Sequence, residues 1–444
     1  MNTSLTGADL EPVLSSLDAA NAAFSARFPG IRLNRLPIHT LYGGAHLFRK
    51  ETPEKLATLA SRHMDTYAPN FEDFAAALEI PTGIAEAVYQ RVKQKLSREA
   101  IEDLRLDFED GYGARADAEE DGHADQAANE VAEGVRQGRL PPFIGIRIKS
   151  LSEETKHRSL RTLDLFLTTF AAKDIALPDP FYVTLPKVTD PNQVEALAAC
   201  IELLEERCGF AEGSIRVELM IETIQSIINP AGGIGIPALI DAGRGRVTSA
   251  IMGTFDYTAT CNIASHYQDH RHPSADFARH MMQACLTGTA VNICDGITNI
   301  MPIPPHRGNE LTSAQLQENF SVVHDAWRIH MNNILHTLSL GIYQSWDLNP
   351  AQLPIRYAAF YRFFLEGLQD AGARLKSFID QAAQASMVGN TFDDAASAQG
   401  LLNFFVNGIN CGALTEAEAL ETGITVEELH GRSFQQIVEN RMKS

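Results

Sequence analysis

The sequence predicts an α/β fold, a (β/α)8 TIM barrel with a helical lead-in before it and a helical extension after it. Eight short apolar segments alternate with segments of helical periodicity, which is the pattern of parallel strands joined by helices. Charged residues recur just past several of these strands, where a barrel enzyme keeps its chemistry. The pattern leaves a doubly wound open sheet as the alternative. However, no GxGxxG follows the first strand and no Walker A motif occurs, so nucleotide-binding folds lose their usual support.

Three regions follow from this pattern: a helical lead-in over residues 1–30, a catalytic barrel over 31–372 and a C-terminal helical extension over 373–444. The lead-in is polar and Ala-rich and ends at Pro29-Gly30. Most of the predicted strands are bounded by Gly, Pro or a charged residue, which are common strand stops. The eight predicted strands are residues 37–44, 101–108, 141–149, 181–188, 216–223, 247–252, 290–296 and 341–348.

Segments of helical spacing lie between and after the strands. Residues 52–98 open with Thr-Pro-Glu, a helix-start signal, and are interrupted at residues 81–83. A long helix is predicted for residues 313–338, and the aromatic run over residues 357–364 has the spacing of a helix that packs against the barrel or a neighbouring subunit. Beyond about residue 375 we expect helices with breaks at Gly389-Asn390 and Gly412-Ala413.

Composition and charge restrict the class of partner. The chain has 444 residues, 45% hydrophobic and 21% charged, which is an ordinary globular composition. Its formal net charge of −19 argues against a nucleic-acid or anionic-membrane partner, since either would require a concentrated basic face. An anionic small-molecule substrate would therefore need local help from arginine, lysine or a metal ion.

The six cysteines contain no CxxC pair and no metal-ligand spacing. They are typical of buried or incidental thiols in a reducing compartment. The N-terminus shows no basic segment followed by an apolar one, and no stretch approaches the length of a membrane-spanning helix. We therefore expect a soluble, cytoplasmic protein.

Two acids, Glu222 and Asp256, follow consecutive predicted strands that are joined by a loop-helix-loop segment. Strands joined by a helix lie parallel, so both acids should emerge at the same edge of one sheet. A pair of carboxylates at the carboxyl ends of neighbouring parallel strands suits Mg²⁺, which keeps several waters and takes further ligands from a bound substrate. The alternative is that each acid caps the next helix or pairs with a lysine.

Other charged residues follow the remaining strands in barrel order. Several have a plain structural alternative: Arg147 could be a strut that pairs with Glu109, and Lys187 could form an ion pair instead of acting as a nucleophile. A histidine cluster, His266, His270 and His272, is more typical of a solvated loop than of a zinc site. The charged residues that the strands place at this edge, besides Glu222 and Asp256, are Glu109, Asp110, Arg147, Lys187 and Asp295.

Five ordered motifs resemble those of the citrate lyase beta-subunit-like and HpcH/HpaI aldolase superfamily. Residues 107–111, Asp-Phe-Glu-Asp-Gly, resemble its Asp-Leu-Glu-Asp motif, and residues 185–188, Leu-Pro-Lys-Val, match its Leu-Pro-Lys-Val motif. Residues 221–223 are similar to Ile-Glu-Thr, and residues 253–257 to Gly-x-x-Asp-Phe. Residues 348–352 resemble Ile-His-Pro-x-Gln, with Asn in place of His. The resemblance covers roughly residues 35–355 and is specific through the order of its motifs.

The resemblance implies a Mg²⁺-dependent barrel, with Mn²⁺ as a possible substitute, that makes or breaks a carbon-carbon bond next to a carbonyl. It implies that Glu222 and Asp256 ligate the metal, that Arg147 binds the substrate carboxylate or steadies the enolate oxygen, and that Glu109 and Asp110 organise metal-bound waters. Substrate contacts would come from Arg147, Lys187, Gly253 and Thr254. A cation bound to the substrate oxygen would stabilise the enolate as a Lewis acid. These barrels commonly associate, so we also expect a homo-oligomer.

The chain departs from the family pattern in two places. His39-Thr40 stands where citrate lyase-like chains have Arg-Ser, with Arg35 as the nearest arginine, and Asp110 stands where the HpaI branch has a histidine base. The general base is therefore not identified, and Asp393 and Asp394 of the extension are candidates.

Three functions remain open. The first is a lyase or aldolase acting on a 2-oxo acid or a hydroxyacyl thioester, which we favour. The second is a malate synthase-like condensing enzyme, and the third is a non-catalytic barrel that binds an acyl or oxo-acid ligand. The fold class does not decide among them, because barrel loops set specificity.

Overall fold

Eight parallel strands form the centre of the protein in a computed structural model. The structure describes residues 4–30, 35–308, 310–380, 386–388, 391–393, 395–421 and 424–425. They run in the order β7-β6-β5-β4-β3-β2-β1-β8. A parallel bridge between Asp295 and Ser345 joins the two ends of this order, with the Asp295 N–H donating to the Gln344 carbonyl over 2.8 Å. The sheet is therefore a barrel, which confirms the predicted fold and excludes the open sheet. The strands are β1 His39–Gly44, β2 Asp103–Asp107, β3 Phe143–Arg147, β4 Phe181–Leu185, β5 Ile215–Ile221, β6 Val247–Met252, β7 Asn292–Cys294 and β8 Ser345–Asp347.

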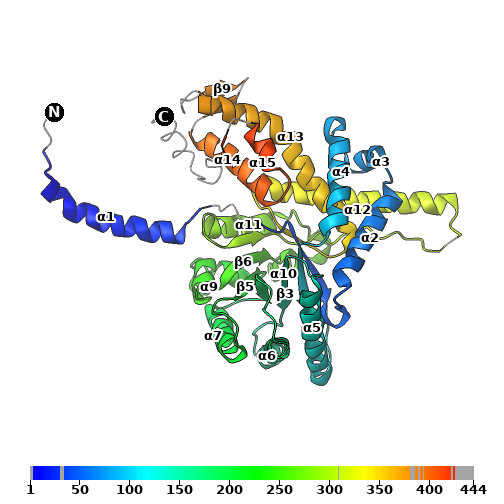
Figure 1. The fold of residues 1–444 in the computed structure, drawn as a ribbon, viewed down its shortest axis with the longest axis horizontal. Coiled ribbons are helices and arrows are strands. Elements are labelled where there is room, and N and C mark those ends of the chain that lie inside the picture. The colour runs from blue at the N-terminus through cyan, green and yellow to red at the C-terminus, as the bar shows by residue number, and fades with distance from the viewer. Residues whose placement is uncertain are drawn as a thin grey trace.

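Helices surround this barrel, and each predicted strand is matched by an observed one (Figure 1). The predicted break at residues 81–83 falls where α3 gives way to α4, and the predicted helix over 313–338 is α12. Between β1 and β2 lie η1 Ala45–Leu47, α2 Thr52–Tyr67, α3 Phe71–Leu78 and α4 Thr82–Glu99. The later connections contain α5 Asp117–Gln137, α6 Lys156–Ala171, α7 Pro191–Cys208, α8 Ile224–Ile227, α9 Ile236–Ala242, α10 Thr254–Thr260, η2 Ser265–Tyr267, α11 Pro273–Leu286 and α12 Ser313–Ser339.

The C-terminal extension differs from the expected run of helices. After η3 Pro350–Gln352 comes α13 Leu353–Asp380. It continues across the expected boundary at residue 372, because Ala371 and Leu375, on either side of that boundary, are both buried in the main core. Two short antiparallel strands, β9 Ser386–Val388 and β10 Thr391–Asp393, follow before α14 Ala395–Asn410 and α15 Glu416–Leu420. The predicted break at Gly389-Asn390 lies outside the described residues. Segments this short and rich in β-formers pair more readily than they form helix.

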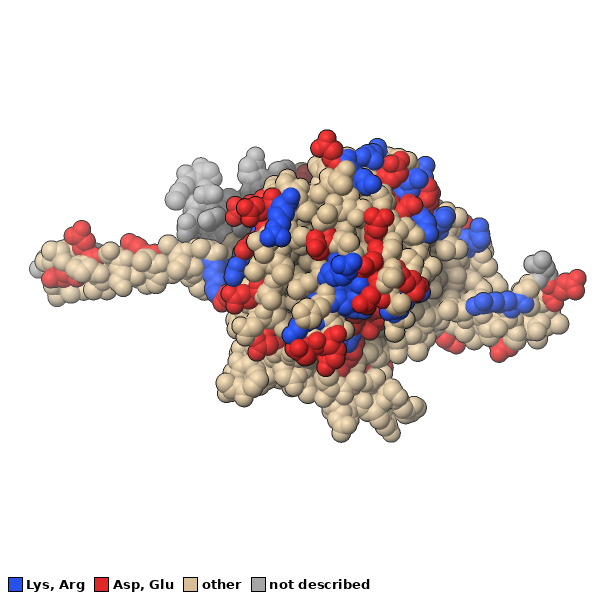
Figure 2. Space-filling view, turned by 90° about the horizontal axis from the view of Figure 1, so that it is seen from below, with Lys and Arg blue, Asp and Glu red and all other residues tan. Residues whose placement is uncertain are grey.

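The lead-in is helical, as predicted, and α1 Gly7–Arg27 projects away from the barrel (Figure 1). None of its residues is buried. It joins the barrel where the Gly30 N–H donates to the Gly288 carbonyl over 2.9 Å. Among the described residues, no helix combines the length and apolar content that a membrane crossing requires. On the face in Figure 2, basic and acidic side chains are intermixed.

The inside of the barrel is filled by two different kinds of side chain. Nearer the C-terminal ends of the strands, an apolar cluster unites side chains from five strands: Tyr42, Met220, Ile251, Cys294 and Trp346. Below it lies a buried polar network in which Glu218 accepts hydrogen bonds from Thr184 and Ser249, each over 2.8 Å, and from the Tyr42 hydroxyl over 3.1 Å. The barrel is therefore a packed core with a floor beneath its mouth.

Candidate active site at the barrel mouth

The predicted site residues come together at the C-terminal ends of the strands. Glu109 and Asp110 lie in the loop after β2, and Arg147 is the last residue of β3. Lys187 follows β4, Glu222 follows β5, and Asp256 lies in the first turn of α10 after β6. Parallel strands deliver all of these side chains to the same end of the barrel, which is the end where barrel enzymes build their active sites.

Lys187 links the acids at this mouth. Its ammonium group bonds to Glu109, lies 3.2 Å from Oδ2 of Asp110 and lies 3.9 Å from Oδ1 of Asp256. Its backbone N–H donates to Oε1 of Glu222 over 2.6 Å. Burial works to lower the pKa of Lys187, but the charges of Glu222 and Glu109 outweigh it and raise the pKa above its ordinary value. The lysine is therefore a charged centre contacted by acids from three loops.

Glu222 is the most buried acid of the mouth, with 1% of its surface exposed. Burial and the nearby charge of Asp256 raise the pKa of Glu222 to about 8, while Lys187 opposes this shift. The close approach of Glu222 to the next strand depends on Gly253, because a Cβ at that position would lie 2.3 Å from Oε2 of Glu222. The glycine of the Gly-x-x-Asp motif thus makes room for the acid of the preceding motif.

Arg147 is 2% exposed and is held by an acid that sequence reasoning did not select as a site residue. Its Nε donates to Oδ1 of Asp107 over 2.7 Å, and its Nη2 donates to the other oxygen of the same carboxylate. The remaining Nη1 lies 3.3 Å from Oε2 of Glu109. The predicted partner, Glu109, is therefore present, but Asp107 makes the bidentate contact that fixes the guanidinium plane.

Asp107 also shapes the acidic loop. Its carboxylate accepts hydrogen bonds from the backbone N–H groups of Glu109, over 2.9 Å, and Gly111, over 2.7 Å. A Cβ on Gly111 would lie 2.5 Å from this carboxylate, so the loop needs glycine there. Asp107 is the first acid of the Asp-Phe-Glu-Asp motif, so the sequence did carry a signal for its role.

Two aromatic rings and two unpaired donors complete the mouth. The Arg147 guanidinium lies 4.9 Å from the ring centre of Tyr42 and 5.2 Å from that of Trp346. Thr254 Oγ1 and Trp346 Nε1 are buried and have no hydrogen-bond partner. A Cβ on Gly296 would approach Thr254 Oγ1 to 2.2 Å, so the β7 end packs closely here. Trp346 was missed because its position in the predicted last strand gives no sign of what it faces.

Asp295, in contrast, belongs to a separate buried cluster. It accepts a 2.7 Å hydrogen bond from Nε of Arg279, and its other oxygen lies 3.3 Å from Nε2 of His270. His270 is therefore part of an ion-pair cluster and does not lie in a solvated loop. Within the described ranges, no group of three or more His, Cys, Asp or Glu residues is arranged as a metal cluster. Asp394 and the side chain of Asp393 lie outside the described residues.

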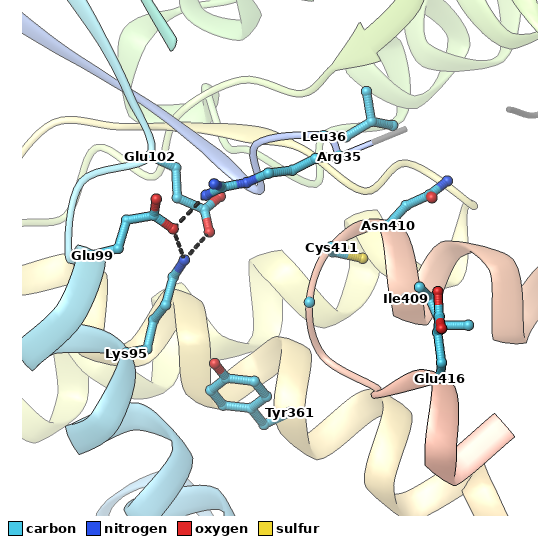
Figure 3. A pocket seen from close by; sticks show the side chains of 11 residues that line it. Arg35, Leu36, Lys95, Glu99, Glu102, Tyr361, Ile409, Asn410, Cys411 and Glu416 are labelled. Carbon is cyan, nitrogen blue, oxygen red and sulfur yellow. Dashed lines mark hydrogen bonds and ion pairs between the residues drawn. The ribbon is translucent and has the colours of Figure 1, made fainter. Parts of the chain in front are cut away.

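A cavity lies at the opposite end of the barrel from these acids. It has a volume of about 430 Å³ and is bounded by Leu36, just before β1, Glu102, just before β2, and the C-terminal helices. Figure 3 shows Lys95 between Glu99 and Glu102, and Lys95 pairs with both of these acids. The chemistry-bearing residues are instead grouped at the mouth.

The mouth acids fit a hard divalent cation. Mg²⁺ is usually held by one or two protein carboxylates together with waters and substrate oxygens. Glu222 and Asp256 supply two such carboxylates from adjacent strand ends, and both lie at Lys187, whose N–H donates to Glu222 and whose ammonium is 3.9 Å from Asp256. Glu109 and Asp110 bond to the ammonium group of Lys187. Nothing in this donor set favours a softer metal, since it contains no sulfur or imidazole.

Comparisons with known proteins agree with the fold. The family model described as "Domain of unknown function (DUF6986)" matches residues 17–437. No curated protein matches the chain. A solved structure described as a citrate lyase from Burkholderia xenovorans LB400 has a TM-score of 0.57 at 18% identity, covering 88% of this chain and 97% of that chain. The resemblance to citrate lyase beta-subunit-like proteins is thus confirmed for the fold.

A second solved structure, the CitE protein of Mycobacterium tuberculosis in complex with magnesium, acetoacetate and coenzyme A, has a TM-score of 0.48 at 15% identity. It covers 86% of this chain and 99% of that chain. At this distance the likeness carries no weight for the site.

Proposed function

The chain belongs to the family described as "Domain of unknown function (DUF6986)", and we propose that it is a Mg²⁺-dependent carbon-carbon lyase acting on a 2-oxo acid or a hydroxyacyl thioester. One observation carries this proposal: Glu222, Asp256 and Arg147 converge with Lys187 at the barrel mouth, in the strand order of the citrate lyase-like motifs. Fold alone would not suffice, since barrels host many chemistries.

The first requirement of such a lyase is a place for a cation beside the substrate carbonyl. Glu222 and Asp256 are the residues that would hold Mg²⁺ or Mn²⁺. When bound there, the cation would act as a Lewis acid for the enolate that is left after the carbon-carbon bond breaks. The rigid hold on Glu222, through the Lys187 N–H and the close contact with Gly253, presents its carboxylate in one orientation.

The second requirement is recognition of a carboxylate or carbonyl oxygen. Asp107 fixes the Arg147 guanidinium through two hydrogen bonds and leaves Nη1 toward the acidic loop. The remaining donor, Nη1, carries a permanent positive charge and would bind a single oxygen of the substrate. Thr254 Oγ1 and Trp346 Nε1 are buried donors with no protein partner, so a substrate oxygen would satisfy them.

The third requirement is a site that limits water. The apolar cluster of Tyr42, Met220, Ile251, Cys294 and Trp346 closes the barrel beneath the mouth. Electrostatic stabilisation of an enolate is stronger over such a floor than in open solvent, because the local dielectric constant is lower.

A substrate panel tests the proposal. Purified protein is incubated with 2-oxo acids bearing a 4-hydroxy or 4-carboxy group and with hydroxyacyl thioesters, with Mg²⁺ or with EDTA, and cleavage products are quantified. We expect turnover that requires the cation. Glu222→Gln should lower turnover by about 10³-fold with folding retained, as for loss of a group that stabilises the transition state. Glu195→Gln is a matched control, because that acid pairs with Arg244 on the surface.

Three outcomes would contradict the lyase. Turnover that is unchanged in EDTA or in Glu222→Gln would show that these acids are not the centre of the reaction. Product formed only from glyoxylate and acetyl-CoA would show a condensing enzyme with the same site. Ligand binding without turnover on any member of the panel would show a binding protein.

A further inference from the structure

Lys187 stands in an unusual position among the charges of the mouth. Its ammonium contacts acids from two loops, Glu109 and Asp110 after β2 and Asp256 after β6. Its backbone N–H holds a fourth acid, Glu222. Glu222 and Asp256 are the two residues that would hold the divalent cation. One lysine thus serves the same carboxylates that the cation would use.

The backbone at Lys187 fixes this position. Its φ angle is 51°, in the left-handed region that residues other than glycine rarely adopt. The 2.6 Å hydrogen bond from its N–H to Glu222 accompanies this conformation. Such backbone strain persists where surrounding contacts enforce it and is concentrated at functional sites. The lysine is therefore built into the acid cluster by its main chain as well as by its side chain.

Arg147 neutralises less of the negative charge of these acids than Lys187 does. Its Nε and Nη2 are already committed to Asp107, and the remaining Nη1 lies 3.3 Å from Glu109 and 3.9 Å from Asp110. Lys187 is thus the basic residue nearest to Asp256 among the described ion pairs, and its side chain is 34% exposed. A positive charge this close to a metal site weakens cation binding through direct repulsion.

We propose that Lys187 is an internal competitor of the divalent cation, which couples cation binding to binding of the anionic substrate. The ammonium and the cation neutralise the same carboxylates, so the cation alone binds weakly. A substrate carboxylate that pairs with Lys187 draws the ammonium away from Asp256 and strengthens cation binding. By linkage, the cation strengthens substrate binding by the same factor. This inference rests on the proposed metal-dependent function.

The test measures Mg²⁺ binding by isothermal titration calorimetry in the full-length protein, with and without oxalate as a dianionic probe. The variants are Lys187→Met, which removes the charge, and Lys187→Arg, which keeps it. Lys93→Met is the matched control, because Lys93 forms a surface pair with Asp65 over 2.7 Å. Circular dichroism and thermal unfolding check that each variant is folded.

We expect Lys187→Met to bind Mg²⁺ more tightly than the wild type by on the order of 10- to 100-fold. Lys187→Arg and Lys93→Met should stay within about threefold of the wild type. The factor by which oxalate enhances Mg²⁺ binding should fall in Lys187→Met. Oxalate chelates Mg²⁺ equally in the experiments on both proteins. The difference between the enhancement factors of the wild type and of Lys187→Met therefore measures the contribution of the lysine charge.

The outcomes separate this inference from the proposed function. If the wild type binds Mg²⁺ and folded Lys187→Met binds it no more tightly, or with the same oxalate enhancement, the competitor role is wrong while the metal site stands. If neither protein binds Mg²⁺ at any concentration tested, the metal-dependent function is overturned and the inference falls with it.

Discussion

Two sets of acids at the C-terminal end of the same barrel have opposite electrostatic situations. After β7 and β8, Asp295 and Asp347 each have an arginine of their own, Arg279 and Arg356, and each lies beside a histidine. Burial works to raise the pKa of both acids, but the arginines and histidines outweigh it and lower the pKa below the ordinary value. After β2, β5 and β6, four acids share Lys187, and the pKa of Glu222 is raised to about 8.

This difference separates acids whose charge is already neutralised from acids that share their counter-charge. A buried acid with a dedicated arginine is neutralised and gains nothing from a further cation. The four acids at Lys187 share that lysine, with Arg147 near only Glu109 and Asp110, so they keep an excess of negative charge that a divalent cation would relieve. The position of an acid just after a barrel strand does not show whether its charge is neutralised, whereas its basic neighbours in the fold do show this.

The largest expected effect comes from breaking a dedicated pair. Arg279→Leu leaves Asp295 buried without its main partner, so we expect the free energy of unfolding to fall by about 3–5 kcal/mol. Chemical denaturation of the variant and of Arg244→Leu, a surface arginine that should change stability by less than about 1 kcal/mol, measures this effect. A loss for Arg279→Leu no larger than that for Arg244→Leu would remove the distinction between the two kinds of acid.

The second effect concerns a buried histidine at the other end of the barrel. Burial lowers the pKa of His39 to about 4 from an ordinary value of 6.5, although Glu102 opposes the shift. Between about pH 4 and pH 6.5, His39 therefore binds a proton more readily in the unfolded chain than in the folded protein. The stability that His39 contributes is complete above pH 6.5 and is lost as the pH falls to about 4, by on the order of 3 kcal/mol.

Denaturation curves of the wild type and His39→Gln at several pH values between 4 and 7 measure this contribution. The glutamine can still accept the hydrogen bond that His39 Nε2 accepts from the Glu102 N–H. We expect the stability of the variant relative to the wild type to improve steadily as the pH falls. A constant difference across the range would show that His39 does not stay neutral in the fold.

The third effect is on catalysis through Arg147. Asp107→Asn removes the charge that fixes the guanidinium and weakens the support of the acidic loop, so we expect kcat/KM to fall by about 10- to 100-fold. Steady-state kinetics on the substrate found by the panel, with Asp121→Asn as a control at a peripheral acid that pairs with Arg161, measures this effect. Unchanged kinetics would mean that Arg147 does not need this orientation.

The smallest change in stability is expected at Thr254. Its hydroxyl is buried without a partner, so Thr254→Val should leave the free energy of unfolding within about 1 kcal/mol of the wild type or raise it. If the hydroxyl donates to substrate, KM should rise by about tenfold. A substantial loss of stability with unchanged KM would assign Thr254 to the structure and not to the substrate site.

Much of the fold followed from the sequence because its signals are local. The predicted strands over residues 181–188 and 247–252 match β4 and β6 within three residues at each end, and the predicted helix over 313–338 matches α12. The β9–β10 hairpin was not expected, because three-residue strands are too short to show a period.

The site was predicted as a set of positions and not as a set of contacts. The motifs placed Glu222 and Asp256 at one end of the barrel, and the structure brings them together there. The polar network around Glu218 inside the barrel was missed, although charged residues alternate with apolar ones in β2 and β5. A strand period shows which residues share a face, but it does not show whether that face meets solvent, apolar side chains or other charges.

The sequence by itself determined the barrel and the edge at which the acids emerge, because strand and helix periods and the parallel direction of joined strands depend on residues near one another in the chain. Only the tertiary structure decided which acid received a dedicated arginine and which acids were left to share Lys187. Those pairings join residues far apart in the chain, and they depend on angstrom-scale distances that no local pattern encodes.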